Sequence, residues 1–274
     1  MNYKKKKIDF STPIIMGILN LSNNSFYDGG RYVSKKQIID HVQKMMDHGA
    51  QIIDIGAESS KPGSEPITEQ QELSLIIPTI KLLKQKFNNI TISIDTYKSR
   101  IAKESINQGA DIINDISAGE MDKNMFNVIS ESKTKYVMMH MKGNPKTMQE
   151  SPNYSNIIKE IIKYFDQKIK KLNDRGFNDI IIDPGFGFGK TLENNYKILN
   201  NIKEFTRFDL PIMSGISRKS MIYNVLNNDP SECLNGTSVL NTLLLNSGVN
   251  IIRVHDVKEA MECIKITNFV NKNK

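Results

Sequence analysis

The chain has 274 residues and a formal net charge of +7, and 39 % of its residues are hydrophobic against 24 % charged. This globular composition excludes whole-chain disorder, and a count of two cysteines, Cys233 and Cys263, excludes a disulfide scaffold. No apolar run reaches the ~18 residues of a membrane span, and Lys and Arg form no stripe with interleaved aromatic residues, so we expect no membrane and no nucleic-acid partner.

The N-terminal segment combines four lysines, Lys4–Lys7, with a short apolar run, Pro13–Leu19. The run begins at a proline, ends at Asn20, and is followed by no small-residue cleavage site, which argues against a signal peptide. We therefore expect a basic tail and lead-in over residues 1–12, one domain over residues 13–274, and a cytoplasmic protein.

Short β-branched runs then alternate with longer helical patterns along the chain. Strands are predicted at Ile14–Asn20, Gln51–Gly56, Thr91–Asp95, Asp111–Ile116, Tyr136–Met141, Asp179–Asp183, Pro211–Ile216 and Ile251–Val254. Helices are predicted at Lys35–Gly49, Thr68–Phe87, Ser99–Gly109, Asp122–Ser132, Ser155–Leu172, Leu192–Phe205, Ser220–Leu226, Glu232–Ser247 and Lys258–Asn271.

The predicted strands are nearly all apolar, which is typical of parallel strands buried on both faces. Several helices end at a glycine just before the next strand, as at Gly49, Gly109 and Gly248. Eight such units in one chain of this length predict an α/β protein with a single (β/α)8 TIM barrel. A doubly wound open sheet stays as the alternative, because a sequence pattern does not show closure.

Polar residues fall at the C-terminal end of nearly every predicted strand. They are Asn20, Asp54, Asp95, Asn114, Asp115, His140, Asp183, the run Ser217–Lys219, Arg253 and His255. In a barrel these positions meet at one end, where the chemistry takes place. For Asp54 and Asp115, a role in holding a loop is as consistent with the sequence as a role in binding.

The residue types divide into two groups. Asp95, Asn114 and Asp183 offer acceptors and an amide, which suit a flat heterocycle carrying ring N–H and amino donors. Asn20 adds a neutral oxygen that Mg²⁺ accepts as a ligand. No spacing of His and Cys is typical of zinc.

The second group, Lys219, Arg253 and His255, consists of donors that suit phosphate or diphosphate. The segment Pro184–Thr191 nearly matches a nucleotide phosphate loop, but Pro184 replaces its first glycine and no Walker-B partner is evident. Its glycines are expected to let the backbone approach a ligand held by Asp183.

Taken together, these motifs closely resemble the dihydropteroate synthase family, in family order and over nearly the whole chain. The matching segments are Met16–Asn20 with Ser25–Gly30, Asp54–Gly63, Ser93–Thr96, Ile113–Ile116, Met139–Met141, Asp183–Thr191, Ser217–Ser220 and Arg253–Val257. The resemblance implies the same barrel, usually a homodimer, with Mg²⁺ as cofactor and sulfonamides as inhibitors.

The implied substrates are 6-hydroxymethyl-7,8-dihydropterin diphosphate and 4-aminobenzoate, and the implied products are 7,8-dihydropteroate and diphosphate. The implied mechanism is substitution at the pterin methylene with early loss of diphosphate. Family roles carry over to catalytic Asp183, Lys219, Arg253 and His255, and to the metal ligand Asn20. Further substrate contacts are implied for Ser60, Asp95, Asn114 and Ser220. Lid-loop positions are implied for Ser25, Phe26, Asp28, Lys61 and Pro62.

The sequence departs from the family in both lid loops. Leu21–Asn24 reads Leu-Ser-Asn-Asn where Val-Thr-Pro-Asp is usual, and Ser60-Lys61 stands where Thr-Arg is usual. These changes concern 4-aminobenzoate more than the pterin. Two alternatives remain, a methyltransferase-type pterin barrel and a pterin-binding paralogue without turnover, although a methyltransferase needs no grip on diphosphate.

Overall fold

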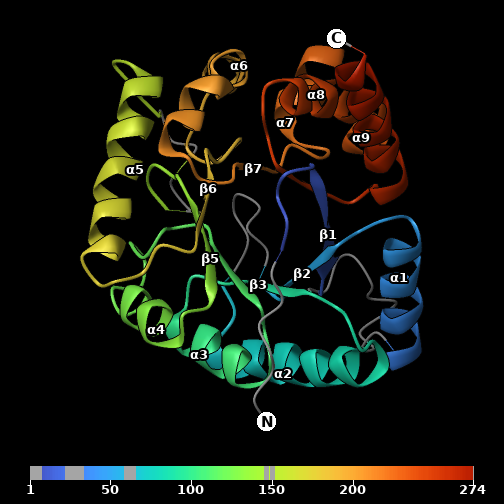
Figure 1. The fold of residues 1–274 in the computed structure, drawn as a ribbon, viewed down its shortest axis with the longest axis vertical. Helices are drawn as coiled ribbons and strands as arrows, with labels where there is room; N and C mark the ends of the chain where they lie inside the picture. Colours follow the sequence, from blue (N-terminus) through green and yellow to red (C-terminus); the bar gives the residue numbers. More distant parts are fainter. Residues whose placement is uncertain (1–7, 22–33, 59–65, 145–147, 149–151, 274) are drawn as a thin grey trace.

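The computed structural model describes residues 8–21, 34–58, 66–144, 148 and 152–273, and within them eight strands are surrounded by helices (Figure 1). The strands are β1 Ile14–Asn20, β2 Ile52–Gly56, β3 Ile92–Asp95, β4 Ile112–Asp115, β5 Lys135–Met139, β6 Ile180–Asp183, β7 Met213–Ser214 and β8 Ile251–Val254. The helices are α1 Lys35–Asp47, α2 Glu69–Lys86, α3 Ser99–Asn107, α4 Met125–Ser132, α5 Ile157–Asn173, α6 Leu192–Asn200, α7 Ser220–Leu226, α8 Leu234–Asn246 and α9 Val257–Lys272, with 3₁₀ turns η1 Ile202–Phe208 and η2 Pro230–Glu232.

The strands are parallel and lie in sequential order around a ring, β6-β5-β4-β3-β2-β1-β8-β7. A bridge between Ile182 and Ile212 joins the two ends, and the Ile182 N–H donates to the Pro211 carbonyl at 3.0 Å. This order and the bridge confirm the predicted (β/α)8 barrel and exclude the doubly wound sheet, whose strand order reverses at a switch point.

Alternation along each strand divides the side chains between two cores. Ile53 and Ile55 face outward and pack with the helices in the main apolar cluster. Ile52 faces the barrel axis, where it packs with Ile14, Met16, Ile112, Val137, Ile181, Met213 and Ile251. These apolar side chains fill one end of the barrel. Because alternate residues of a strand face the same side, the residue two positions further along also faces the barrel axis, nearer to the other end, as Asp54 does after Ile52.

The largest differences between predicted and observed elements are in β7 and α6. The strand predicted at Pro211–Ile216 is reduced to Met213–Ser214, and its late start fits Pro211, which has no N–H to donate to a ladder. The helix predicted to run to Phe205 ends at Asn200 and continues as a 3₁₀ turn. There the Asn201 side chain donates to the Lys197 carbonyl at 2.8 Å, which satisfies an acceptor at the helix end.

No helix in the described ranges is long and apolar enough to span a membrane. The basic run Lys4–Lys7 lies outside the described residues, so the proposed division at residue 13 stays a prediction.

Candidate active site

Strand register places the predicted polar residues side by side at one end of the barrel. Asn20 pairs with Gly56, Gly56 with Asp95, and Asp95 with Asn114, so the tips of β1 to β4 form a continuous row. A Cβ at Gly56 would lie 3.5 Å from the Asp95 Cβ and 3.8 Å from the Asn20 Oδ1. The side chains of Asn20 and Asp95 therefore both border the Gly56 position.

Arg253 on β8 bonds to two aspartates at the centre of the site. Its Nε donates to the Asp54 Oδ2 at 2.6 Å, and its Nη2 donates to the Asp95 Oδ2 at 2.6 Å. The Asn114 Nδ2 also donates to the Asp54 Oδ2, at 3.1 Å. Asp54 is fully buried, and no partner is found for its Oδ1 among the described residues. Asp54 thus belongs to the site, as a buried carboxylate that orients both Arg253 and Asn114.

Burial perturbs the ionisation of these groups. Loss of solvent raises the pKa of Asp95 to about 7, because the repulsion of Asp54 adds to burial while Arg253 offsets only part of the rise. Burial alone lowers the pKa of Arg253, but Asp54 and Asp95 raise it above its ordinary value. The guanidinium therefore stays charged, and Asp95 is poised between its neutral and ionised forms near neutral pH.

Asp183 and Lys219 form the other side of the site. Asp183 lies at the tip of β6 and its Oδ1 accepts the Gly185 N–H at 2.8 Å. The Lys219 Nζ donates to the Phe186 carbonyl at 2.5 Å and lies 4.6 Å from the centre of the Phe188 ring. Burial raises the pKa of Asp183 and lowers the pKa of Lys219 to about 8, and the attraction between the two charges opposes both shifts.

His255 lies two residues beyond Arg253, on the same side of the chain. Its Nδ1 is 3.0 Å from the Ser217 Oγ, which also accepts the His255 backbone N–H at 3.3 Å. Ser220 is exposed at the first residue of α7, next to Lys219. The loops after β7 and β8 thus contact each other through Ser217 and His255, and the Arg253 charge is near enough to Lys219 to lower its pKa. The roles implied for Lys219, Ser220, Arg253 and His255 stay predictions.

The glycine-rich segment after β6 is built around its own lysine. The Lys190 Nζ donates to the carbonyls of His140, Gly185 and Phe188 at 3.1, 2.8 and 2.9 Å. A side chain at Gly185 would lie 2.0 Å from the His140 carbonyl oxygen, so this glycine admits close packing of backbone on backbone. The expected approach to a ligand is thus replaced at Gly185 by an approach to the β5 loop, and Lys190 is a structural residue.

Two strand-end residues turn away from the centre. Asp115 faces the helical layer, where it accepts from the Tyr136 hydroxyl at 2.7 Å and from the Ser117 and Gly119 backbone N–H groups. It therefore holds a loop. The His140 ring packs edge-on against Tyr164, with 4.9 Å between ring centres, and burial lowers its pKa well below the ordinary value.

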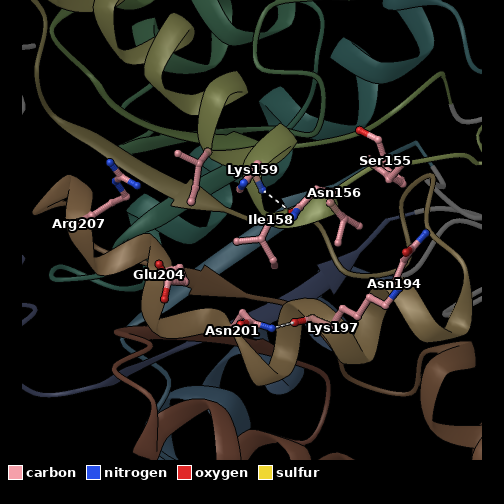
Figure 2. Close-up of a pocket in the computed structure, with 12 residues that line it drawn as sticks. Ser155, Asn156, Ile158, Lys159, Asn194, Lys197, Asn201, Glu204 and Arg207 are labelled. Atoms are coloured by element: carbon pink, nitrogen blue, oxygen red, sulfur yellow. Dashed lines mark hydrogen bonds between the residues drawn. The ribbon is translucent and has the colours of Figure 1, made fainter.

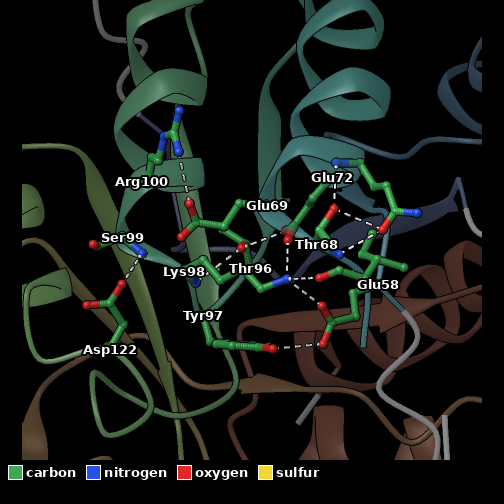
Figure 3. Close-up of polar contacts among 12 residues, drawn as sticks. Glu58, Thr68, Glu69, Glu72, Thr96, Tyr97, Lys98, Ser99, Arg100 and Asp122 are labelled. Carbon is green, nitrogen blue, oxygen red and sulfur yellow. Dashed lines mark hydrogen bonds and ion pairs between the residues drawn. The ribbon is translucent and has the colours of Figure 1, made fainter. Parts of the chain in front are cut away.

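A buried polar cluster beside β3 was not predicted from the sequence. The Lys98 Nζ lies 2.6 Å from the Glu58 Oε2 and 2.7 Å from the Glu72 Oε2, and it donates to the Ile67 carbonyl at 2.9 Å (Figure 3). The Thr96 hydroxyl donates to the Glu72 Oε1 at 2.8 Å. The signal was present, because Thr96 and Lys98 lie within three residues after Asp95, but their partners are 24 to 40 positions away in sequence.

All the lid-loop positions implied by the resemblance lie outside the described residues. They are Ser25, Phe26, Asp28, Lys61 and Pro62, and the implied substrate contact Ser60 also lies outside the described residues. Their roles stay predictions.

A separate hollow of about 510 Å³ lies between α5, α6 and η1 (Figure 2). It is lined by Tyr154, Ser155, Asn156, Ile157, Ile158, Lys159, Ile162, Asn194, Lys197, Asn201, Glu204 and Arg207. No strand-tip side chain of the site contributes to it, so the converging charges rather than this hollow mark the candidate active site.

Comparison with known proteins agrees with this geometry. The family model described as "Pterin binding enzyme" matches residues 16–255. The dihydropteroate synthase of Escherichia coli strain K12 is 41 % identical over 261 residues, which are 94 % of this chain and 92 % of the relative. That of Clostridium beijerinckii is 38 % identical, covering 93 % of each. A crystal structure of the Yersinia pestis dihydropteroate synthase with a sulfonamide drug has a TM-score of 0.93 and 37 % identity, and 99 % of each chain is covered.

Proposed function

Because the chain belongs to the dihydropteroate synthase family of pterin-binding enzymes, we propose how its own side chains divide the work of that reaction. The enzyme joins 6-hydroxymethyl-7,8-dihydropterin diphosphate to 4-aminobenzoate and releases 7,8-dihydropteroate and diphosphate. The observation that carries the assignment of roles is the Arg253 guanidinium held between two carboxylates at the mouth of the barrel.

The hydrogen-bond acceptors inside the barrel bind the pterin. Asp95 and Asp183 accept hydrogen bonds from its ring N–H and amino groups, and Asn114, held by Asp54, offers its amide oxygen. Both aspartates lie where water is largely excluded, so a complementary ring replaces the hydrogen bonds that burial denies them. These carboxylates also favour positive charge in the ring.

Bond cleavage comes first. The C–O bond between the pterin methylene and the diphosphate breaks, the electron pair leaves with diphosphate, and the resulting cation is delocalised into the pterin ring. Lys219, Arg253 and His255 stabilise the negative charge on the leaving group, while Asp95 and Asp183 stabilise the cation. The neutral amine of 4-aminobenzoate then forms the C–N bond and loses its proton to solvent. We assign to Ser220, which is exposed at the start of α7, the hydrogen bond to the benzoate carboxylate.

The residues present are compatible with Mg²⁺ carried on the diphosphate. The described residues contain no group of three or more His, Cys, Asp or Glu arranged for a metal. Mg²⁺ usually takes only one or two protein oxygens and completes its shell with water and phosphate. The Asn20 amide oxygen, which lies beside Gly56 at the tip of β1, would supply such an oxygen. When bound, the ion adds positive charge beside the departing diphosphate.

Diphosphate release tests this function. Purified protein with the pterin diphosphate and Mg²⁺ should release diphosphate in a reaction that depends on 4-aminobenzoate, with an equal amount of dihydropteroate. Chelation of the metal should slow release, and added Mg²⁺ should restore it. Release at the same rate without 4-aminobenzoate would instead indicate hydrolysis and would contradict the assignment.

A homodimer is the second part of the proposal. Exposed apolar side chains gather on the neighbouring helices α7, α8 and α9, namely Val225, Leu226, Val239, Leu243, Ile266, Phe269 and Val270. Monomers rarely expose a continuous apolar face of this kind. α9 also exposes Glu262 and Lys265 beside it, and a two-fold axis lets the acidic group of one copy face the basic group of the other.

Replacing Ile266 and Phe269 together by glutamate should convert the dimer to a monomer, because buried charge opposes association. Light scattering after gel filtration should give twice 31.1 kDa for the parent and 31.1 kDa for the variant. The matched control is Met121→Glu, which adds charge at an exposed apolar residue outside this face. A parent that already has the monomer mass would reject the proposal.

We further place the enzyme in the cytoplasm. Cys233 and Cys263 are both buried free thiols, which is the usual state of cysteine in a reducing compartment.

A further inference from the structure

Arg218 lies in the loop between β7 and α7, directly before Lys219, and carries none of the roles assigned above. Its Nε donates to the Asp256 Oδ2 at 2.9 Å, and its Nη2 donates to the Asp256 Oδ1 at 2.8 Å. Asp256 directly follows His255. We propose that Arg218 is a positioning residue, whose two-pronged contact with Asp256 holds Lys219 and His255 in the arrangement that grips diphosphate. This inference rests on the roles proposed for Lys219 and His255.

The backbone at Arg218 is strained and held in place. Its φ is +57°, a left-handed conformation that is unfavourable for a residue with a Cβ. The Arg218 N–H donates to the Thr237 Oγ1 at 3.2 Å, and its Nη1 donates to the Ser231 carbonyl at 3.4 Å. Contacts with α8, η2 and the loop after β8 thus maintain a conformation that the isolated loop would avoid.

This conformation sends two adjacent side chains in different directions. Arg218 reaches Asp256 on the loop after β8, whereas Lys219 reaches the Phe186 carbonyl on the loop after β6. Release of the strained backbone would therefore move the Lys219 side chain as well. The expected displacement is small, but a misplacement of about 1 Å costs an enzyme on the order of 100-fold in rate.

A second contact lies beside the first. Ser217 bonds His255 through both the ring Nδ1 and the backbone N–H, so residues 217 and 218 face residues 255 and 256 in consecutive order. The neutral Ser217 contact alone leaves the loops free to shift along each other. The charged pair adds a planar, two-point contact, which a lysine at position 218 does not reproduce.

The pair also neutralises a charge that would oppose the substrate. Without Arg218, the Asp256 carboxylate lies one residue from His255, has no other ion-pair partner among the described residues, and repels diphosphate. Removal of Arg218 and of the Asp256 charge should therefore not have independent effects. This expected lack of additivity separates positioning through Asp256 from a general loss of stability.

The test compares Arg218→Ala, Asp256→Asn, their combination and Arg218→Lys. We expect Arg218→Ala to lower kcat/KM for the pterin diphosphate about 10- to 100-fold and to raise the inhibition constant of inorganic diphosphate by a similar factor. The double variant should be no worse than Arg218→Ala. Arg218→Lys, which keeps the charge and the fold, should show a smaller loss of the same kind. The control is Arg100→Ala, which breaks an exposed pair with Glu69 at 3.2 Å and should change neither constant.

Losses that multiply in the double variant, or diphosphate inhibition unchanged in both Arg218 variants, would overturn the proposal. Lys219→Met and His255→Gln measured in parallel separate this result from failure of the roles it rests on. If those two variants retain parental diphosphate inhibition, the roles of Lys219 and His255 are wrong. If they lose it while the Arg218 variants do not, only the role of Arg218 is rejected.

Discussion

Replacement of Asp183 by asparagine should lower kcat/KM for the pterin diphosphate by about 10²- to 10³-fold. Asparagine keeps the shape of the side chain, and its oxygen still accepts the Gly185 N–H that Asp183 accepts at 2.8 Å. The second oxygen becomes an NH₂ group, which donates and therefore cannot accept a hydrogen bond from a pterin N–H group. The substitution also removes the negative charge that stabilises the ring cation. Steady-state kinetics with varied pterin diphosphate measures the loss.

The control for Asp183 is Asp179, which directly precedes the same strand at the other end of the barrel. Asp179 is half exposed and pairs with Lys135, so Asp179→Asn should leave kcat/KM within about twofold, because that end of a barrel serves stability rather than chemistry. Thermal unfolding of both variants checks that the fold is retained. Parental turnover in a folded Asp183→Asn protein would reject Asp183 as a pterin contact.

Replacement of Arg253 by methionine should reduce both stability and activity. The substitution leaves the Asp54 and Asp95 carboxylates without the counter-ion that they share. Removal of one partner of a buried ion pair lowers the free energy of unfolding by about 3–5 kcal/mol. Denaturant unfolding measures this cost. Activity should fall by about 10²-fold or more, because Arg253 both orients Asp95 and faces the leaving group.

The stability loss in Arg253→Met should depend on pH in a defined direction. Arg253 lowers the pKa of Asp95, which is about 7 in the parent, so its removal raises that pKa further. A carboxyl with a raised pKa destabilises the fold as it ionises, and the stability difference between parent and variant should therefore grow as pH rises above about 7. The acid limb of kcat/KM should move to higher pH for the same reason. A difference that shrinks with rising pH would contradict the ion-pair assignment.

Two comparisons make the Arg253 result specific. The double variant Asp95→Asn with Arg253→Met removes one uncompensated charge, so it should recover part of the stability without recovering activity. Binding of the pterin diphosphate should weaken more than binding of a plain pterin, because Arg253 serves both ends of the substrate. Equal losses for the two ligands would restrict Arg253 to holding Asp95 and would end its assignment as a diphosphate anchor.

The local pattern of the chain was sufficient to identify the repeating unit and the strand tips. Apolar runs that alternate with helical patterns predicted all eight strands, and β1 and β8 have the predicted bounds. Asp95, Asn114 and Asp183 could be placed in the site because each directly ends such a run, and a parallel barrel brings all strand ends to one face. These are short-range properties, since helix and strand periodicity depend on residues close in sequence.

Other features depend on residues that are far apart in sequence, and only the folded chain reveals them. The Ile182–Ile212 bridge closes the ring, and the Arg253 contact with Asp54 spans 199 positions. Asp54 lies near the end of β2 and Asp115 ends β4, yet Asp54 faces the barrel axis and Asp115 the helices, because strand alternation assigns sides only once register is set. Lys190 shows the same limit, since a motif typical of phosphate binding here folds its own loop around three carbonyl groups.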